Sequence, residues 1–225
     1  MDKAVEAKMM KGRVGAAMRT ITDEAQRHAI FREYEALLNA HRGSNKMLMT
    51  HLQNAILPAI AMYRVLPTRG FGKTEVRRMI RKSVLDAAKP ARNLFQSLGK
   101  LPFFFALFRR MCELSMDSMF GESGWDMRFK VYTPSEIRWD CHACFYCDVL
   151  KQYGMPELAP IFCESDDVMY GSIPHIKWAH KDDRARRYGV RFLFHQRAIG
   201  TTQKRRGLLW IPTTNGRSRM SSRRC

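Results

Sequence analysis

Hydrophobic residues recur at helical spacing through the first half of the chain. In the segment 22–42 they return every three or four positions, and Thr22 stands where a helix would be capped. A second helix is predicted over 46–65, with a kink or restart at Pro58, because proline lacks the N–H that an interior helical residue donates. The pattern therefore predicts consecutive helices rather than strands.

The helical pattern extends to about residue 120. Thr74 is placed to cap a helix that Pro90 closes or bends. The apolar run 101–120 is predicted to form a helix that is buried on most sides. Residues 1–20 could begin a helix but offer little apolar face.

After Gly121 the chain changes to short runs in which polar and apolar residues alternate, as in strands that are buried on one face. The predicted elements are strands over 127–133, 136–143, 171–178 and 190–195, with a helix over 147–154. The fold class is therefore α+β: a helical N-terminal half (1–120) and a small antiparallel sheet with an inserted helix (121–196), in one domain over 1–196. Residues 197–225 show neither period, so we predict a disordered basic tail there.

Composition fits a globular chain. Of 225 residues, 45% are hydrophobic, which is enough to form a core. The longest uncharged apolar stretches, 55–63 and 101–108, are far shorter than the roughly 20 residues of a membrane span. The first residues lead into no signal-like apolar region. We therefore expect a soluble, cytoplasmic protein with no membrane partner.

The positive charge is concentrated near the C-terminus. The chain has a net charge of +18, and residues 179–225 contribute 13 of the 39 basic residues but only two of the 21 acidic ones. The remaining residues carry a modest +7. Because the basic segment lacks interleaved aromatic residues and a defined basic face, we do not expect nucleic acid as a partner.

Candidate chemistry gathers in one segment rich in cysteine. Three thiols follow one another at Cys-x2-Cys spacing, a spacing that zinc sites use, and a fourth lies further along: Cys141, Cys144, Cys147 and Cys163. Three thiols at this spacing cannot all point the same way from one strand or one helix. That geometry counts against a metal site, but the spacing still supports a first interpretation: a metal- or small-ligand-binding module built on these four cysteines.

The second interpretation is a nucleophilic thiol. Cys144 or Cys163 would then need a base, which His142, His175 or a carboxylate could provide. Cys147 and Cys112 are most simply small core residues, the common role of a free cysteine. A structural role is as plausible for His175 as a catalytic one.

Two stretches resemble a known family. NAILPAIAMYRVL, from Asn54, and CFYCDVLKQYGMPELAPIFCESDD, from Cys144, followed by HIKW at 175–178, are similar to the L-2-amino-thiazoline-4-carboxylic acid hydrolase family over roughly 45–178. The resemblance implies a hydrolase that opens a cyclic amidine C–N bond of a small-molecule substrate and converts the thiazoline amino acid toward N-carbamoyl-cysteine. We expect no cofactor.

The resemblance also implies a set of site residues. The recurring cysteine of the family falls on Cys144, its second cysteine on Cys163, its acidic position on Asp166 and its histidine on His175. The roles we predict are Cys144 as nucleophile, His175 as base, Asp166 as orienting carboxylate and Cys163 as a second thiol of unassigned role. Since a nucleophile needs its base within hydrogen-bond reach, the four residues are predicted to share one pocket.

The resemblance stops after Trp178. The family continues with a pattern like R-T-x-T-I-A-x-G-x-x-x-C-D-F-x-F, which this chain lacks. Read one base out of register, the codons from His180 onward can spell T-K-T-I-A-R-G and then C-D-F-x-F at the family's spacing. Our hypothesis is a one-base insertion near codons 178–179 that leaves residues 179–225 out of frame. It predicts that the strand beginning near Gly171 lacks its natural partner.

Overall fold

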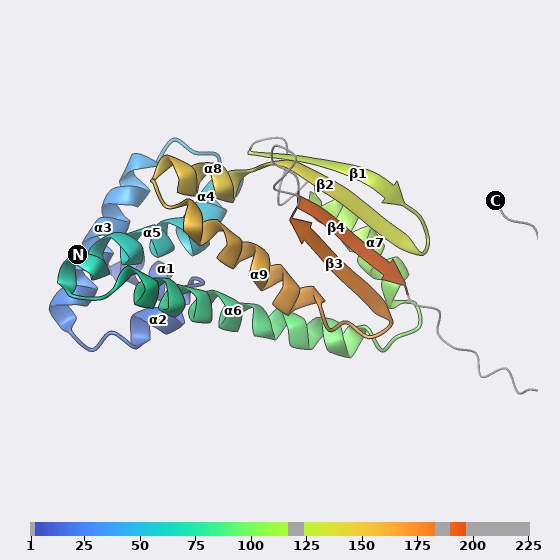
Figure 1. Cartoon of the computed structure of the whole chain (residues 1–225), viewed down its shortest axis with the longest axis horizontal. Coiled ribbons are helices and arrows are strands. Elements are labelled where there is room, and N and C mark those ends of the chain that lie inside the picture. The colour runs from blue at the N-terminus through green and yellow to red at the C-terminus, as the bar shows by residue number, and fades with distance from the viewer. Residues whose placement is uncertain (1–2, 117–123, 183–189, 197–225) are drawn as a thin grey trace, which may run out of the picture.

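The computed structural model describes residues 3–116, 124–182 and 190–196 (Figure 1). The helical elements are α1 (Lys3–Lys11), α2 (Gly15–Arg19), α3 (Glu24–Ala40), α4 (Lys46–His51), the π-helical turn η1 (Leu52–Ile56), α5 (Leu57–Val65), the 3₁₀ turn η2 (Leu66–Arg69), α6 (Lys73–Leu98), α7 (Phe104–Ser115), α8 (Phe145–Gln152), the 3₁₀ turn η4 (Pro156–Leu158) and α9 (Ala159–Tyr170). The strands are β1 (Trp125–Tyr132), β2 (Glu136–Cys144), β3 (Ile176–Asp182) and β4 (Val190–Gln196). None of these helices is long and apolar enough to cross a membrane.

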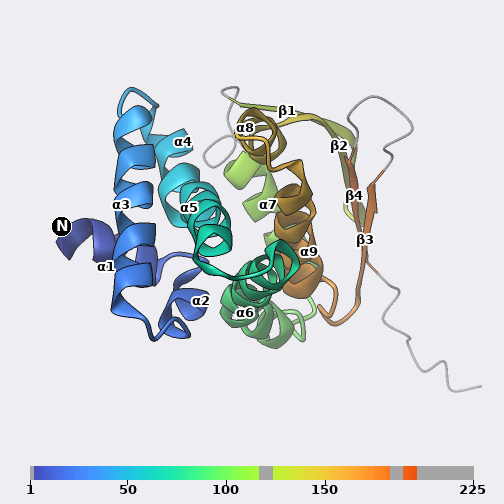
Figure 2. The same cartoon turned by 60° about the vertical axis from the view of Figure 1, so that its left-hand side comes forward.

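The predicted α+β class is confirmed. The four strands form one antiparallel sheet in the order β1-β2-β4-β3. Seen edge-on, the sheet has α6, α7 and α9 on the same side (Figure 2). Its inner face packs on α7 through Trp139, Phe194 and Phe108, whereas a second, larger core lies among the helices of the N-terminal half. Helix α9 therefore runs between the helical half and the sheet.

Two helices have boundaries that differ from the predicted ones. Helix α3 is capped by Asp23, whose side chain accepts the Gln26 N–H, and not by Thr22. Helix α6 continues through Pro90 to Leu98. Pro90 lies on the exposed side of α6, where water can satisfy the carbonyl that loses its amide partner. The stripe of buried residues that faces the core is therefore not interrupted.

Pro58 produces a π-helical turn rather than a simple kink. The Leu57 N–H bonds the carbonyl of Leu52, five residues back, instead of that of Gln53. The Gln53 carbonyl accepts the Tyr34 hydroxyl at 2.8 Å. In α-helical register the Asn54 carbonyl would pair with residue 58, which has no N–H, and here it accepts the Arg13 amide at 2.8 Å. The turn thus anchors the N-terminal segment to the middle of the helical half.

Helix α7 was predicted to be buried on most sides, and this prediction is wrong. Phe104, Phe105 and Phe108 are buried under the sheet. The opposite side of the same segment exposes Phe103 and Leu114 by 61% and 56%. The apolar run 101–120 therefore forms an amphipathic helix whose second face is also apolar.

Strand β3 has a partner, contrary to what the out-of-frame hypothesis predicts. It pairs with β4 from Ile176↔Gln196 to Asp182↔Val190. The predicted strand 190–195 is the one that provides this pairing. The hypothesis itself remains a prediction, which the nucleotide sequence around codon 179 would test, and the predicted disorder of 197–225 lies outside the described residues.

Ser83 gives a stability prediction that arises from this fold. Its hydroxyl, on α6 and 2% exposed, donates to the Arg13 carbonyl at 2.9 Å and accepts the Ala17 N–H at 3.1 Å. Ser83→Ala leaves both backbone groups without that partner, so we expect the free energy of unfolding to fall by about 1–3 kcal/mol. Urea unfolding of the two proteins measures the difference, with the exposed Ser97→Ala as a control. An unchanged midpoint would contradict the role of Ser83 as a bridge.

Candidate functional site

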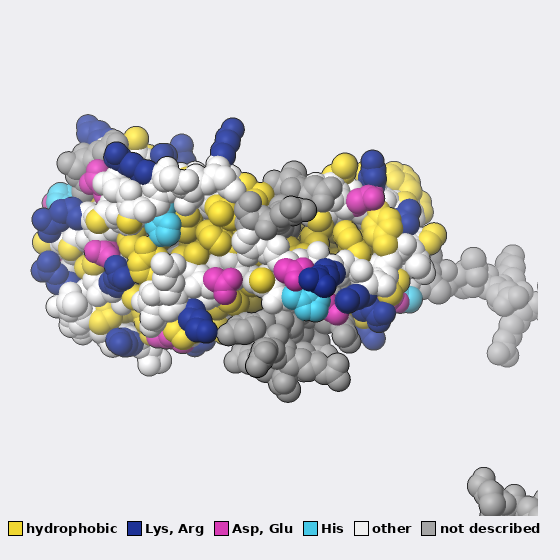
Figure 3. Space-filling model, turned by 90° about the horizontal axis from the view of Figure 1, so that it is seen from above, with side chains coloured by type: hydrophobic (Ala, Val, Ile, Leu, Met, Phe, Trp, Pro, Cys, Tyr) yellow, Lys and Arg dark blue, Asp and Glu magenta, His cyan; other side chains and the backbone are white. Residues whose placement is uncertain are grey.

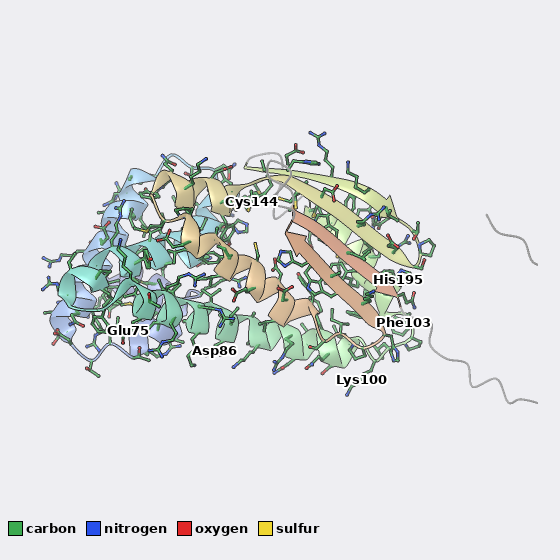
Figure 4. The ribbon with its side chains drawn as sticks, viewed as in Figure 1. Glu75, Asp86, Lys100, Phe103, Cys144 and His195 are labelled. Atoms are coloured by element: carbon green, nitrogen blue, oxygen red, sulfur yellow. The ribbon has the colours of Figure 1, made fainter. Side chains whose placement is uncertain are left out.

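The three clustered cysteines lie where a strand turns into a helix. Cys141 and Cys144 belong to the end of β2, and Cys147 to the first turn of α8. Figure 4 shows Cys144 at this junction, on the side of the sheet that meets the helical half. The change from strand to helix brings together thiols that a single regular element would point in different directions.

Hydrogen bonds to Cys144 favour its thiolate. The side chains of Cys141 and Cys147 and the amides of Cys147 and Tyr146, at the start of α8, act on its Sγ as hydrogen-bonding groups. The Cys141 thiol also donates to the Ala143 carbonyl at 3.1 Å. The hydrogen bonds to Cys144 lower its pKa well below that of a free thiol, although burial opposes the shift. The pKa values of Cys141 and Cys147 are raised, first by the hydrogen bond to Cys144 and then by burial. Of the three clustered thiols, Cys144 is therefore the one that loses its proton most readily.

Helix α9 adds Cys163 and Asp166 to this region. Cys163 interacts electrostatically with Cys141 and Cys147, and Asp166 with Cys144. Burial raises the pKa of Asp166 to about 7, and the charges of Asp167 and Cys144 also raise it, whereas Arg13 opposes the shift. Close to neutral pH, Asp166 is therefore able to give or take a proton. Three of the four predicted site residues are brought together.

His175 is not brought to this cluster, and its predicted place beside Cys144 is wrong. It precedes Ile176, which pairs with Gln196, whereas Cys141 pairs with Val190 at the other end of β4. Six residues of strand separate the two ends by about 20 Å. In Figure 4, His195, which pairs with the residue after Ile176, lies at the end of the sheet opposite Cys144. Because β3 runs toward the cysteines, its first residue lies farthest from them.

The surroundings of His175 offer little room. The crevice beside it, lined by Gly99, Pro102 and Phe105 among others, has a volume of about 10 Å³. That is barely enough for one water molecule. His175 itself is exposed and has a φ of 61°. His175 is therefore better described as a turn residue at the edge of the sheet than as a base in a substrate site.

Helix α4 contributes an imidazole, His51, that meets aromatic residues of β1 and α8 and that the sequence did not indicate. The His51 ring nitrogen lies 3.1 Å from the Tyr146 hydroxyl, and the His51 ring contacts the Trp125 ring edge-on at 4.9 Å. Burial raises the pKa of Tyr146. Since His51 and Tyr146 are 95 positions apart, no local spacing could have indicated the pair.

Arg13 also approaches this region from outside the cysteine segment. Its guanidinium donates to Ser165 Oγ at 3.4 Å and acts electrostatically on Asp166 and Tyr146. Gly12 and Gly15 beside it mark a tight turn, a weak signal that carries no chemistry by itself.

The metal-binding interpretation finds no support in the part of the chain that the structure describes, where no three His, Cys, Asp or Glu side chains are arranged to hold a metal ion. On the face shown in Figure 3, Lys and Arg side chains are scattered rather than gathered into one patch. The described surface therefore offers no visible platform for a polyanion on that face.

Comparison with known proteins agrees with the family resemblance found in the cysteine-rich segment. A family model described as L-2-amino-thiazoline-4-carboxylic acid hydrolase matches residues 49–186. The match covers more than half of the chain, and the protein belongs to this family of hydrolases, whose named substrate is a small molecule. Neither the curated proteins nor the solved structures contain a significant match. The matched region includes the cysteines, Asp166, His51 and Tyr146, but not Arg13.

Proposed function

We propose that this chain hydrolyses the ring of L-2-amino-thiazoline-4-carboxylate, or of a close cyclic amidine, with Cys144 as the nucleophile. The observation that carries the proposal is the environment of Cys144: a sulfur stabilised as thiolate at the start of α8, within electrostatic reach of a carboxyl group whose pKa is about 7. A thiolate is the reactive form of cysteine, and a nearby group that titrates close to neutral pH suits proton transfer.

The first half of the reaction forms a covalent intermediate. Cys144 Sγ attacks C2, the ring carbon bonded to sulfur and to two nitrogens, and makes a new C–S bond. The bond from C2 to the ring sulfur then breaks and its electron pair stays on that sulfur. Asp166, in its protonated form, gives this sulfur a proton. The amidine carbon is left attached to Cys144 as an S-linked isothiourea.

The second half releases the product. Water adds to the same carbon and gives up a proton to the Asp166 carboxylate, so the acid of the first step is the base of the second. The bond to Cys144 breaks and returns its electron pair to the thiolate. One water has been added in total, and the product is N-carbamoyl-cysteine with a free thiol. His175 has no part in these steps.

The product determines which bond opens. N-carbamoyl-cysteine keeps the C–N bond of the ring, so its formation requires cleavage of the ring C–S bond. Opening of the ring C–N bond, which the resemblance suggested, would instead give the S-carbamoyl isomer with a free amine. Both products have the same mass, so chemical reactivity must distinguish them.

The test is to incubate the purified full-length chain with L-2-amino-thiazoline-4-carboxylate and assay thiol and primary amine separately. The proposal expects thiol to appear without primary amine, and one oxygen from ¹⁸O-labelled water in the product. Release of amine without thiol would move the cleavage to the C–N bond. If neither thiol nor primary amine forms at any substrate concentration, the proposed function is refuted.

A further inference from the structure

Arg13 places a positive charge beside the cysteine cluster but makes no close ion pair with a described residue. Its only side-chain hydrogen bond is the 3.4 Å contact with Ser165 Oγ, and it forms no ion pair within 4.0 Å in the described parts of the chain. Asp166 is close enough to interact with it electrostatically, but burial favours the neutral form of that carboxyl. A guanidinium has five donors in a planar fork, so most of its hydrogen-bonding capacity remains available.

The backbone of Arg13 is held from two sides, which fixes where the side chain starts. Its N–H donates to the Asn54 carbonyl of the π-helical turn, and its carbonyl accepts the Ser83 hydroxyl. A Cβ at Gly12 would lie 2.8 Å from the Asn54 carbonyl, so only glycine permits this close approach. An arginine anchored in this way is suited to bind a ligand without a large loss of backbone entropy.

We infer that Arg13 binds the carboxylate of the substrate and so selects cyclic amidines that carry an acid group. The inference rests on the proposed function, since it places the amidine carbon at Cys144. A planar guanidinium matches a carboxylate with two parallel N–H···O bonds. The arrangement puts the positive charge of Arg13 against the acid group and leaves Cys144 to attack the ring. Asp166 interacts electrostatically with both Arg13 and Cys144.

If Arg13 had only a structural role, the expected result would be different. If Arg13 only supported Ser165 or the charge balance of Asp166, its loss would affect every substrate of the enzyme alike. If it binds the carboxylate, its loss will affect only substrates that have one. The comparison of a substrate with its decarboxylated analogue separates the two roles.

The experiment measures kcat/KM of wild type, Arg13→Gln and Arg13→Lys with L-2-amino-thiazoline-4-carboxylate and with 2-amino-2-thiazoline. We expect Arg13→Gln to lose roughly 100-fold on the carboxylated substrate, little on the analogue, and Arg13→Lys to fall between. Arg78→Gln, an exposed arginine on α6, is the matched control and should resemble wild type. Equal losses on both substrates would overturn the inference.

Binding to an inert variant separates this inference from the proposed function. In Cys144→Ala, calorimetric titration with the carboxylated ligand should show affinity that disappears when Arg13→Gln is added, while thermal unfolding confirms that both variants are folded. Binding that depends on Arg13 but no turnover by wild type would refute the proposed function and keep the inference. Binding that is indifferent to Arg13, or absent in Cys144→Ala, would overturn the inference.

Discussion

Cys144→Ala should reduce the turnover of L-2-amino-thiazoline-4-carboxylate by at least about a thousandfold, because removal of a nucleophile leaves only the binding and polar contributions of the site. The fold should survive, since Cys144 is at the end of β2 and its backbone pairing with Trp125 does not need the thiol. Steady-state kinetics with circular dichroism as a folding check measures both.

The matched control is Cys112→Ala. Cys112 packs against the core beneath the sheet, and burial raises the pKa of its thiol to about 12, so it is a neutral packing residue. Its substitution should lower stability slightly and leave kcat/KM close to wild type. Full activity of Cys144→Ala would remove the nucleophile from the proposal. A mass increase on Cys144 in acid-quenched wild type would instead support the covalent intermediate.

Asp166 should make both activity and stability depend on pH. Its protonated form is the acid of the first step, so kcat should fall as pH rises through about 7. The free energy of unfolding should also fall as pH rises. The folded-state pKa is raised from 3.8 to about 7, so the contribution of Asp166 is fully present below pH 3.8 and is lost as pH rises toward 7. The slope has an upper limit of about 1.4 kcal/mol per pH unit.

Asp166→Asn is the variant that tests this. It removes the titration, so its free energy of unfolding relative to wild type should improve between pH 4 and pH 8, while its turnover should be low at every pH. Urea unfolding at several pH values, with the exposed Glu75→Gln on α6 as a control, measures the effect. The assignment is refuted if wild type and Asp166→Asn show parallel stability profiles.

The sequence predicted the fold well because its signals are local. Alternation after Gly121 predicted a small antiparallel sheet, and β1, β2 and β4 form close to their predicted ranges. The strand predicted over 171–178 begins later, and β3 spans Ile176–Asp182. Prediction from the sequence failed where tertiary contacts decide which residues are buried. An apolar run such as 101–120 has the same sequence pattern whether one face of its helix is buried or both faces are. Helix α6 continues through Pro90 because this proline lies on its exposed side, whereas a proline facing the core would have broken the helix.

The site was predictable only in part, for a related reason. Cys144 ends β2, and Cys163 and Asp166 follow on α9, so their proximity arises within one short stretch of chain. His175 also belongs to that stretch, but the direction of β3 carries it away from the cysteines. Arg13 and His51 enter from elements far away in the sequence, and no spacing rule reaches across such a distance.

The π-helical turn at Leu52–Ile56 has a consequence for hydrogen exchange. Arg13 lies in the turn between α1 and α2, and its amide is bonded to the Asn54 carbonyl. Its proton therefore exchanges with deuterium when the N-terminal segment detaches from the π-helical turn. A ligand held by the Arg13 side chain would oppose that detachment and slow the exchange of a single backbone proton. The exchange rate of that proton therefore reports, within the intact protein and without an attached probe, how tightly the first helices are held to the site.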